Sequence, residues 1–153
     1  MSSLKKTIAR ALLCFALISL GFALGRMTAG PAQAEPAAFG DAAQVVVYYF
    51  HAPVRCATCN KVEAMTKEVV QSAFAPQLRD GRVVLLVADY QEREDLAKRY
   101  DIASSGIVVV RVRGGAEVEF TRLDEAWFAA EEPLKFRQCV TNAVARRLER
   151  EGA

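Results

Sequence analysis

Runs of β-branched and aromatic residues alternate along this chain with segments whose apolar residues recur at helical spacing. Residues 45–50 (VVVYYF) and 82–88 (RVVLLVA) are two nearly continuous apolar runs. Continuous rather than alternating apolar character is typical of strands that are covered on both faces of a parallel sheet. We therefore predict two buried strands, the first of them in the middle of the sheet.

A second pair of strands is predicted at residues 107–110 and 116–123. Gly114-Gly115 between them is a strong hairpin signal, because glycine adopts the positive φ angles that tight turns between strands require. Val118 and Phe120 alternate with polar residues, so we expect both side chains to point inward.

Amphipathic segments predict three helices, at residues 61–74, 92–100 and 133–150. The second is short and polar, and we expect it to pack through Leu96 and Tyr100. The third carries four apolar residues expected to pack inward: Leu134, Val140, Val144 and Leu148. The predicted element order is β-α-β-α-β-β-α, an α/β fold.

The first 34 residues differ in charge from the rest of the 153-residue chain, since they hold four basic residues and no Asp or Glu. Removing these four from the total of 20 leaves 16 basic against 18 acidic residues, a net charge of −2. This balance gives no reason to expect the basic face that nucleic-acid binding usually needs, so we set that function class aside. The apolar content of 52% is enough for the core of one domain.

Residues 1–34 are expected to be a signal peptide or a membrane anchor. The uncharged run at residues 11–25 spans 15 residues, fewer than the roughly 20 that cross a bilayer comfortably. Ala32-Gln33-Ala34 fits a cleavage site, and the alternative is anchoring through residues 11–25. Either outcome places the remainder outside the cytoplasm, periplasmic or anchored, with a linker at residues 35–43 and one domain at residues 44–151.

The candidate chemistry lies where the first strand turns into the first helix, at residues 51–60 (HAPVRCATCN). Cys56 and Cys59 are one helical turn apart, so their side chains can close a small disulfide ring. At the start of the helix, Cys56 faces unpaired backbone N–H groups and the positive end of the helix dipole, which favour the thiolate. Arg55 adds a nearby positive charge. A nucleophilic thiol beside a resolving thiol is what thiol–disulfide exchange requires.

The same two cysteines have two other interpretations. They could bind a soft metal such as Cu(I), with His51, the only histidine, as a third ligand. They could also form a structural disulfide in an oxidising compartment, although so short a loop gives little entropic stabilisation.

Several other residues also have two interpretations each. His51 either tunes the cysteines or is a loop residue bound to backbone, and Arg55 either activates Cys56 or is merely solvated. Cys139 is either a buried apolar residue of the last helix or a free thiol available for intermolecular bonding. Trp127 and Phe128 either cover the sheet and pin the loop before the last helix or bind a partner.

The element order, with Cys-x-x-Cys at the end of the first strand, resembles the thioredoxin-like fold over roughly residues 44–150. The Tyr100-Asp101-Ile102 segment ahead of the third strand is similar as well. The resemblance implies a three-layer sandwich and a disulfide oxidoreductase that needs no cofactor. It implies that Cys56 is the exposed attacking thiol and Cys59 the more buried resolving thiol. The implied partner is a protein dithiol or disulfide, periplasmic or in the membrane.

The sequence also departs from the thioredoxin pattern. Ser105-Gly106 stands where thioredoxins place a cis-proline close to the sulfurs, so we expect Ser105 and Gly106 to contact the site or its substrate. Residues 45–50 contain no acidic residue, whereas thioredoxins bury one there to manage protons. The Arg-Cys-Ala-Thr-Cys corner, preceded by Tyr-Tyr-Phe-His, also resembles a small exported thioredoxin-like family described as a nitrophenyl compound nitroreductase subunit.

Two functions are therefore predicted as alternatives. The first is a thiol–disulfide oxidoreductase or electron-transfer protein that acts outside the cytoplasm through Cys56 and Cys59. The second is a copper-binding module that uses the same cysteines.

Overall fold

The computed structural model describes residue 42 and residues 44–149. The expected signal peptide or anchor at residues 1–34 lies outside the described residues, as does the expected linker at residues 35–43 apart from Ala42. Among the helices of the described part, none combines the length and the apolar character needed to span a bilayer.

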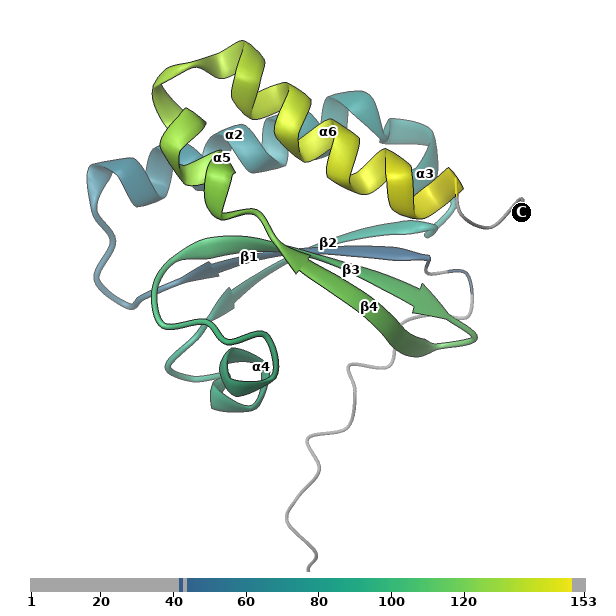
Figure 1. The fold of residues 1–153 in the computed structure, drawn as a ribbon, viewed down its shortest axis with the longest axis horizontal. Coiled ribbons are helices and arrows are strands. Elements are labelled where there is room, and N and C mark those ends of the chain that lie inside the picture. Colours follow the sequence, from purple (N-terminus) through teal and green to yellow (C-terminus); the bar gives the residue numbers. More distant parts are fainter. Residues whose placement is uncertain (1–41, 43, 150–153) are drawn as a thin grey trace, which may run out of the picture. The chain divides into compact units, whose positions relative to one another are not determined.

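A four-stranded mixed sheet forms the middle layer of the domain (Figure 1). Its strands are β1 (Val45–His51), β2 (Val83–Asp89), β3 (Gly106–Arg113) and β4 (Ala116–Arg122), in the order β2-β1-β3-β4. β1 pairs parallel with β2 and antiparallel with β3, and β3 pairs antiparallel with β4. Gly114 and Gly115 form the turn between β3 and β4 with φ angles of 57° and 76°, so the predicted hairpin is confirmed.

Helices cover both faces of this sheet (Figure 1). The longer ones are α2 (Ala57–Ala73) and α6 (Pro133–Glu149), which lie on one face together with the short α5 (Asp124–Phe128). On the other face, α4 (Glu94–Arg99) is the only helix among the described residues. The predicted order β-α-β-α-β-β-α is confirmed, with three short additions: α3 (Ala75–Arg79), α5 and a 3-10 turn at Ala129–Glu131.

Because β1 is central, its side chains supply both hydrophobic cores. Val45, Val47 and Tyr49 point into the core beneath α2 and α6, and all three are fully buried. The intervening Val46, Tyr48 and Phe50 point into the core beneath α4, where Leu96 and Tyr100 meet them as predicted. This double burial explains why the first strand is apolar at every position.

Two predictions about side-chain direction are wrong. The second strand was expected to be buried on both faces, but β2 is an edge strand in which Val87 is 38% exposed. Val118 and Phe120 of β4 are 53% and 44% exposed rather than buried. They project from the opposite edge strand, and the half-exposed ring of Phe120 packs edge-on against Tyr100 with a centroid distance of 5.1 Å.

The packing face of the last helix also differs from the prediction. Leu134 is 82% exposed, whereas Phe136, which the apolar pattern did not single out, is fully buried. Val140 and Val144 are buried as expected and Leu148 packs at the edge of the same core. The predicted helix end at residue 150 lies one residue beyond the described helix.

Candidate functional site

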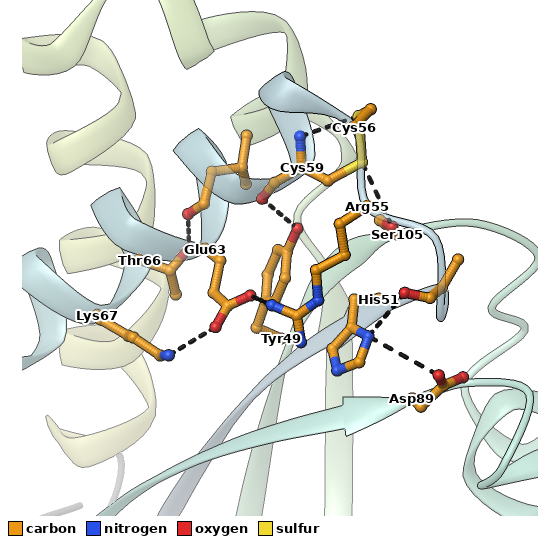
Figure 2. A network of polar contacts seen from close by, with 12 residues as sticks. Tyr49, His51, Arg55, Cys56, Cys59, Glu63, Thr66, Lys67, Asp89 and Ser105 are labelled. Atoms are coloured by element: carbon orange, nitrogen blue, oxygen red, sulfur yellow. Dashed lines mark hydrogen bonds and ion pairs between the residues drawn. A yellow bond between two sulfur atoms is a disulfide. The ribbon is translucent and has the colours of Figure 1, made fainter.

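The two cysteines lie at the corner between β1 and α2, where the sequence places them (Figure 2). They form a disulfide with a Cα–Cα distance of 5.1 Å. Cys56 is the N-cap residue of α2 and is exposed, whereas Cys59 lies within the first turn and is half-buried. An incoming group can therefore approach Cys56 more easily than Cys59.

The start of α2 provides hydrogen bonding for the Cys56 sulfur. Cys56 has an extended backbone, with φ of −80° and ψ of 164°, and its Sγ accepts the backbone N–H of Cys59 at 3.1 Å. The first turn of α2 contains no acidic residue that would oppose the positive end of the helix dipole. Both features stabilise negative charge on Cys56 Sγ once the disulfide is opened.

The guanidinium of Arg55 is paired with a carboxylate of α2 and is not hydrogen-bonded to either sulfur. The guanidinium donates to the carboxylate of Glu63, which also accepts from Lys67 Nζ at 2.6 Å (Figure 2). Glu63 is only 8% exposed, so the ion pair ties the loop before Cys56 to the inner side of the helix. The proposed activation of Cys56 by Arg55 stays a prediction.

His51 ends β1 and is held by backbone, as one of its two interpretations expects. Its Nδ1 donates to the carbonyl oxygen of Ala52 at 2.9 Å and lies 3.9 Å from Asp89 Oδ2. Within residues 44–149, no group of three or more His, Cys, Asp or Glu side chains is arranged to hold a metal ion. His51 therefore does not complete a three-ligand set with the two cysteines.

Ser105 approaches the disulfide from the position just before β3, 46 residues after Cys59 (Figure 2). Ser105 Oγ lies 3.9 Å from Cys59 Sγ. Ser105 and Gly106 also line a cleft of about 260 Å³ together with Trp127 and Phe128 of α5. The structure thus brings the predicted Ser105-Gly106 segment to the cysteine corner.

The sheet order and the disulfide at the β1–α2 corner decide the architecture. The fold is thioredoxin-like. No protein-family model matches the chain, and no curated protein matches it either.

Several solved structures resemble this thioredoxin-like domain, with low sequence identity. They include thioredoxin of Malassezia sympodialis, with 19% identity over 75% of this chain and 86% of that chain at a TM-score of 0.44. Oxidized mitochondrial thioredoxin 3 of Saccharomyces cerevisiae has 15% identity over 67% and 81%, with a TM-score of 0.43. The zinc-bound form of human ERp44 has 17% identity, covering 69% of this chain but 30% of that chain, at a TM-score of 0.45.

Two residues of the thioredoxin-like site were not recognised from sequence. Tyr49 was assigned to the core, but its hydroxyl donates to the carbonyl oxygen of Cys59 at 2.6 Å. Burial, together with the charge of Glu63, raises the pKa of Tyr49 to about 12, so the phenol stays protonated. Glu63 is not singled out within the predicted helix at residues 61–74, although its position four residues after Cys59 places both on one face of that helix.

The remaining candidates lie on α5 and α6. Trp127 packs against the core beneath α2 and α6, whereas Phe128 beside it is 84% exposed. Cys139 is a free thiol, half-buried at the edge of the same core. Burial and the nearby carboxylate of Glu125 raise the pKa of Cys139 to about 11.

The raised pKa of Cys139 predicts a loss of stability at alkaline pH. In the unfolded chain this thiol has its ordinary pKa of about 9, whereas in the folded protein its pKa is about 11. The unfolded state therefore binds fewer protons between these values, and stability falls as pH rises through that range. Urea unfolding at pH 8.5 and 10.5 should show a smaller fall for Cys139→Ala than for the unmodified protein. Equal falls in both proteins would contradict the assignment.

Proposed function

We propose that this protein is a thiol–disulfide oxidoreductase that works through Cys56 and Cys59. The observation that supports it best is the N-cap position of Cys56. Cys56 is exposed and forms a disulfide with the half-buried Cys59. Its sulfur also accepts a hydrogen bond from a backbone N–H of the helix that Cys56 caps. A structural staple would not need its sulfur exposed at a helix start that stabilises the thiolate.

The exchange proceeds in two displacements. A partner thiolate attacks Cys56 Sγ, the Cys56–Cys59 bond breaks, and its electron pair goes to Cys59 Sγ. A second partner thiolate then attacks the partner's own sulfur in the mixed disulfide and releases the Cys56 thiolate. The partner is oxidised to a disulfide and this protein is reduced by two electrons. In the opposite direction Cys56 attacks a partner disulfide and Cys59 displaces the product.

The surrounding residues take supporting roles in this proposal. Ser105 and Gly106 border the cleft beside the disulfide, where an extended partner segment can lie. Arg55 and His51 shape the loop that leads into Cys56, through Glu63 and the Ala52 carbonyl respectively.

We further propose that the domain acts outside the cytoplasm on a periplasmic or membrane-bound protein dithiol. The leader-like composition of residues 1–34 supports this location. The resemblance of the Arg-Cys-Ala-Thr-Cys corner to a nitroreductase-subunit family stays a prediction, and so does a role in electron transfer. Copper binding by the same two cysteines stays a prediction; within the described residues, no third His, Cys, Asp or Glu side chain joins them to hold an ion.

The thiol pKa of Cys56 tests the proposed function, with Cys139 of the same molecule as an internal control. After reduction, we expect Cys56 to be alkylated first and to titrate below the free-thiol value of about 8.5. Cys139 should react last, because burial and Glu125 hold the pKa of its thiol at about 11. Peptide mapping of iodoacetamide adducts at several pH values measures both. A Cys56 that titrates like a free thiol would count against the proposal.

A further inference from the structure

Ser105 places one hydroxyl group beside the disulfide. Its Oγ lies 3.9 Å from Cys59 Sγ, while the hydroxyl of Tyr49 contacts the same cysteine through its backbone carbonyl. Figure 2 shows Ser105 beside the sulfur atoms, and Tyr49 reaching Cys59 from the strand below. Ser105 is half-buried and Tyr49 is fully buried, so both groups have little water to bond.

Counting hydrogens shows how these groups share their bonds. The single proton of the Tyr49 hydroxyl is donated to the Cys59 carbonyl oxygen at 2.6 Å, so the phenol does not donate to the sulfur. Ser105 also has a single hydroxyl proton, which it donates to Cys59 Sγ. A disulfide sulfur is a weak acceptor, which fits the long contact of 3.9 Å. A thiolate is a strong acceptor, because a hydrogen bond to a charged group is shorter and stronger.

The charged groups around this corner are occupied elsewhere. Glu63 accepts from both Arg55 and Lys67, and His51 donates to the Ala52 carbonyl close to Asp89. Within residues 44–149, no charged side chain is hydrogen-bonded to Cys59 Sγ. The hydroxyl of Ser105 is therefore the side-chain donor available to that sulfur.

We propose that Ser105 is a catalytic residue whose hydroxyl donates a shorter and stronger hydrogen bond to Cys59 Sγ when the disulfide opens, and that it stabilises Cys59 as the leaving thiolate. This inference rests on the proposed function, since it concerns the same exchange reaction.

The step needs no further reactant. A partner thiolate forms a bond to Cys56 Sγ, and the electron pair of the Cys56–Cys59 bond passes to Cys59 Sγ. Ser105 keeps its proton and donates a hydrogen bond to the new anion, which solvent protonates later. In the reverse direction the same hydrogen bond favours the Cys59 thiolate that must attack the mixed disulfide.

The test compares Ser105→Ala with Ser105→Thr and Ser104→Ala in the full-length protein. Ser105→Thr keeps the hydroxyl, and Ser104→Ala removes a neighbouring exposed hydroxyl. In a Cys56→Ala background, the Cys59 thiol is titrated by its alkylation rate. We expect Ser105→Ala to raise the Cys59 pKa by about one unit, a tenfold shift in the thiolate ratio. Ser105→Thr and Ser104→Ala should leave that pKa near the parent value.

A second readout uses the protein that retains both Cys56 and Cys59. It is the rate at which dithiothreitol reduces the disulfide between them. Ser105→Ala should slow this reduction several-fold, while circular dichroism remains that of the folded protein. An unchanged Cys59 pKa and an unchanged reduction rate in Ser105→Ala would overturn the inference, and so would equal effects from Ser104→Ala. If the unmodified protein failed to exchange at Cys56 at all, the proposed function itself would be refuted.

Discussion

We expect Cys56→Ser to abolish thiol–disulfide exchange by this protein. The thiolate is the nucleophile, and a serine hydroxyl at the same N-cap cannot ionise at neutral pH or form a mixed disulfide. The rate with an aromatic disulfide that releases a coloured thiol should fall by on the order of 1,000-fold or more. Serine is among the best N-cap residues, so α2 should begin where it does now and the fold should be retained.

The other cysteines supply the controls for this experiment. Cys139→Ser removes a thiol whose pKa is raised to about 11, and it should leave the exchange rate unchanged. Cys59→Ser keeps the attacking sulfur but removes its mate, so it should accumulate mixed disulfides that mass spectrometry can detect. If Cys56→Ser retained activity that Cys139→Ser lost, the reacting sulfur would be on α6 and the assignment would be wrong.

The centre of the site could be predicted because it depends on short-range spacing. A strand, a turn and a helix that begins next to Cys56 follow from residues 45–74 alone, and two cysteines one turn apart must then lie close together. The exposure of Cys56 and the half-burial of Cys59 agree with what the resemblance to thioredoxins implied. This local part of the prediction agrees with the structure.

The partners of the two cysteines could be predicted only in part. Tyr48 and Tyr49 are neighbours in an all-apolar strand, and their pattern does not tell which of them faces α2. Ser105 is 46 residues from Cys59, and its place was inferred from the resemblance to thioredoxins rather than from its chemistry. Glu63 was missed because a carboxylate in an amphipathic helix usually faces water, whereas here Arg55 and Lys67 neutralise it in a nearly buried position.

The apolar runs predicted where the strands lie along the chain, but they did not predict the order of the strands in the sheet. β2 is as apolar as a central strand and yet lies at an edge. Hydrophobicity reports how much of a strand is apolar, while exposure depends on what packs over it. The same limit applies to Val118 and Phe120, which alternate as a buried strand would and point where little covers them.

The largest loss of stability should come from Phe136→Ala. This ring on α6 is fully buried in the core that α2, β1 and β3 share. Truncating a buried phenylalanine removes its apolar contacts and leaves a cavity, which costs about 3–5 kcal/mol. Urea unfolding of the oxidised protein should show this as a lower midpoint with an unchanged m value. Phe136→Leu, which keeps most of the volume, should cost clearly less.

Leu134→Ala is the matched control, since Leu134 is two residues away on the same helix and 82% exposed. We expect a change within about 0.5 kcal/mol, as for other exposed positions. The pair of variants separates two placements of α6, because the sequence pattern puts Leu134 against the core and the structure puts Phe136 there. A large loss from Leu134→Ala with a small one from Phe136→Ala would mean that the helix is rotated about its axis. That rotation would also change the burial of Cys139 and its distance from Glu125, the two causes of its raised pKa.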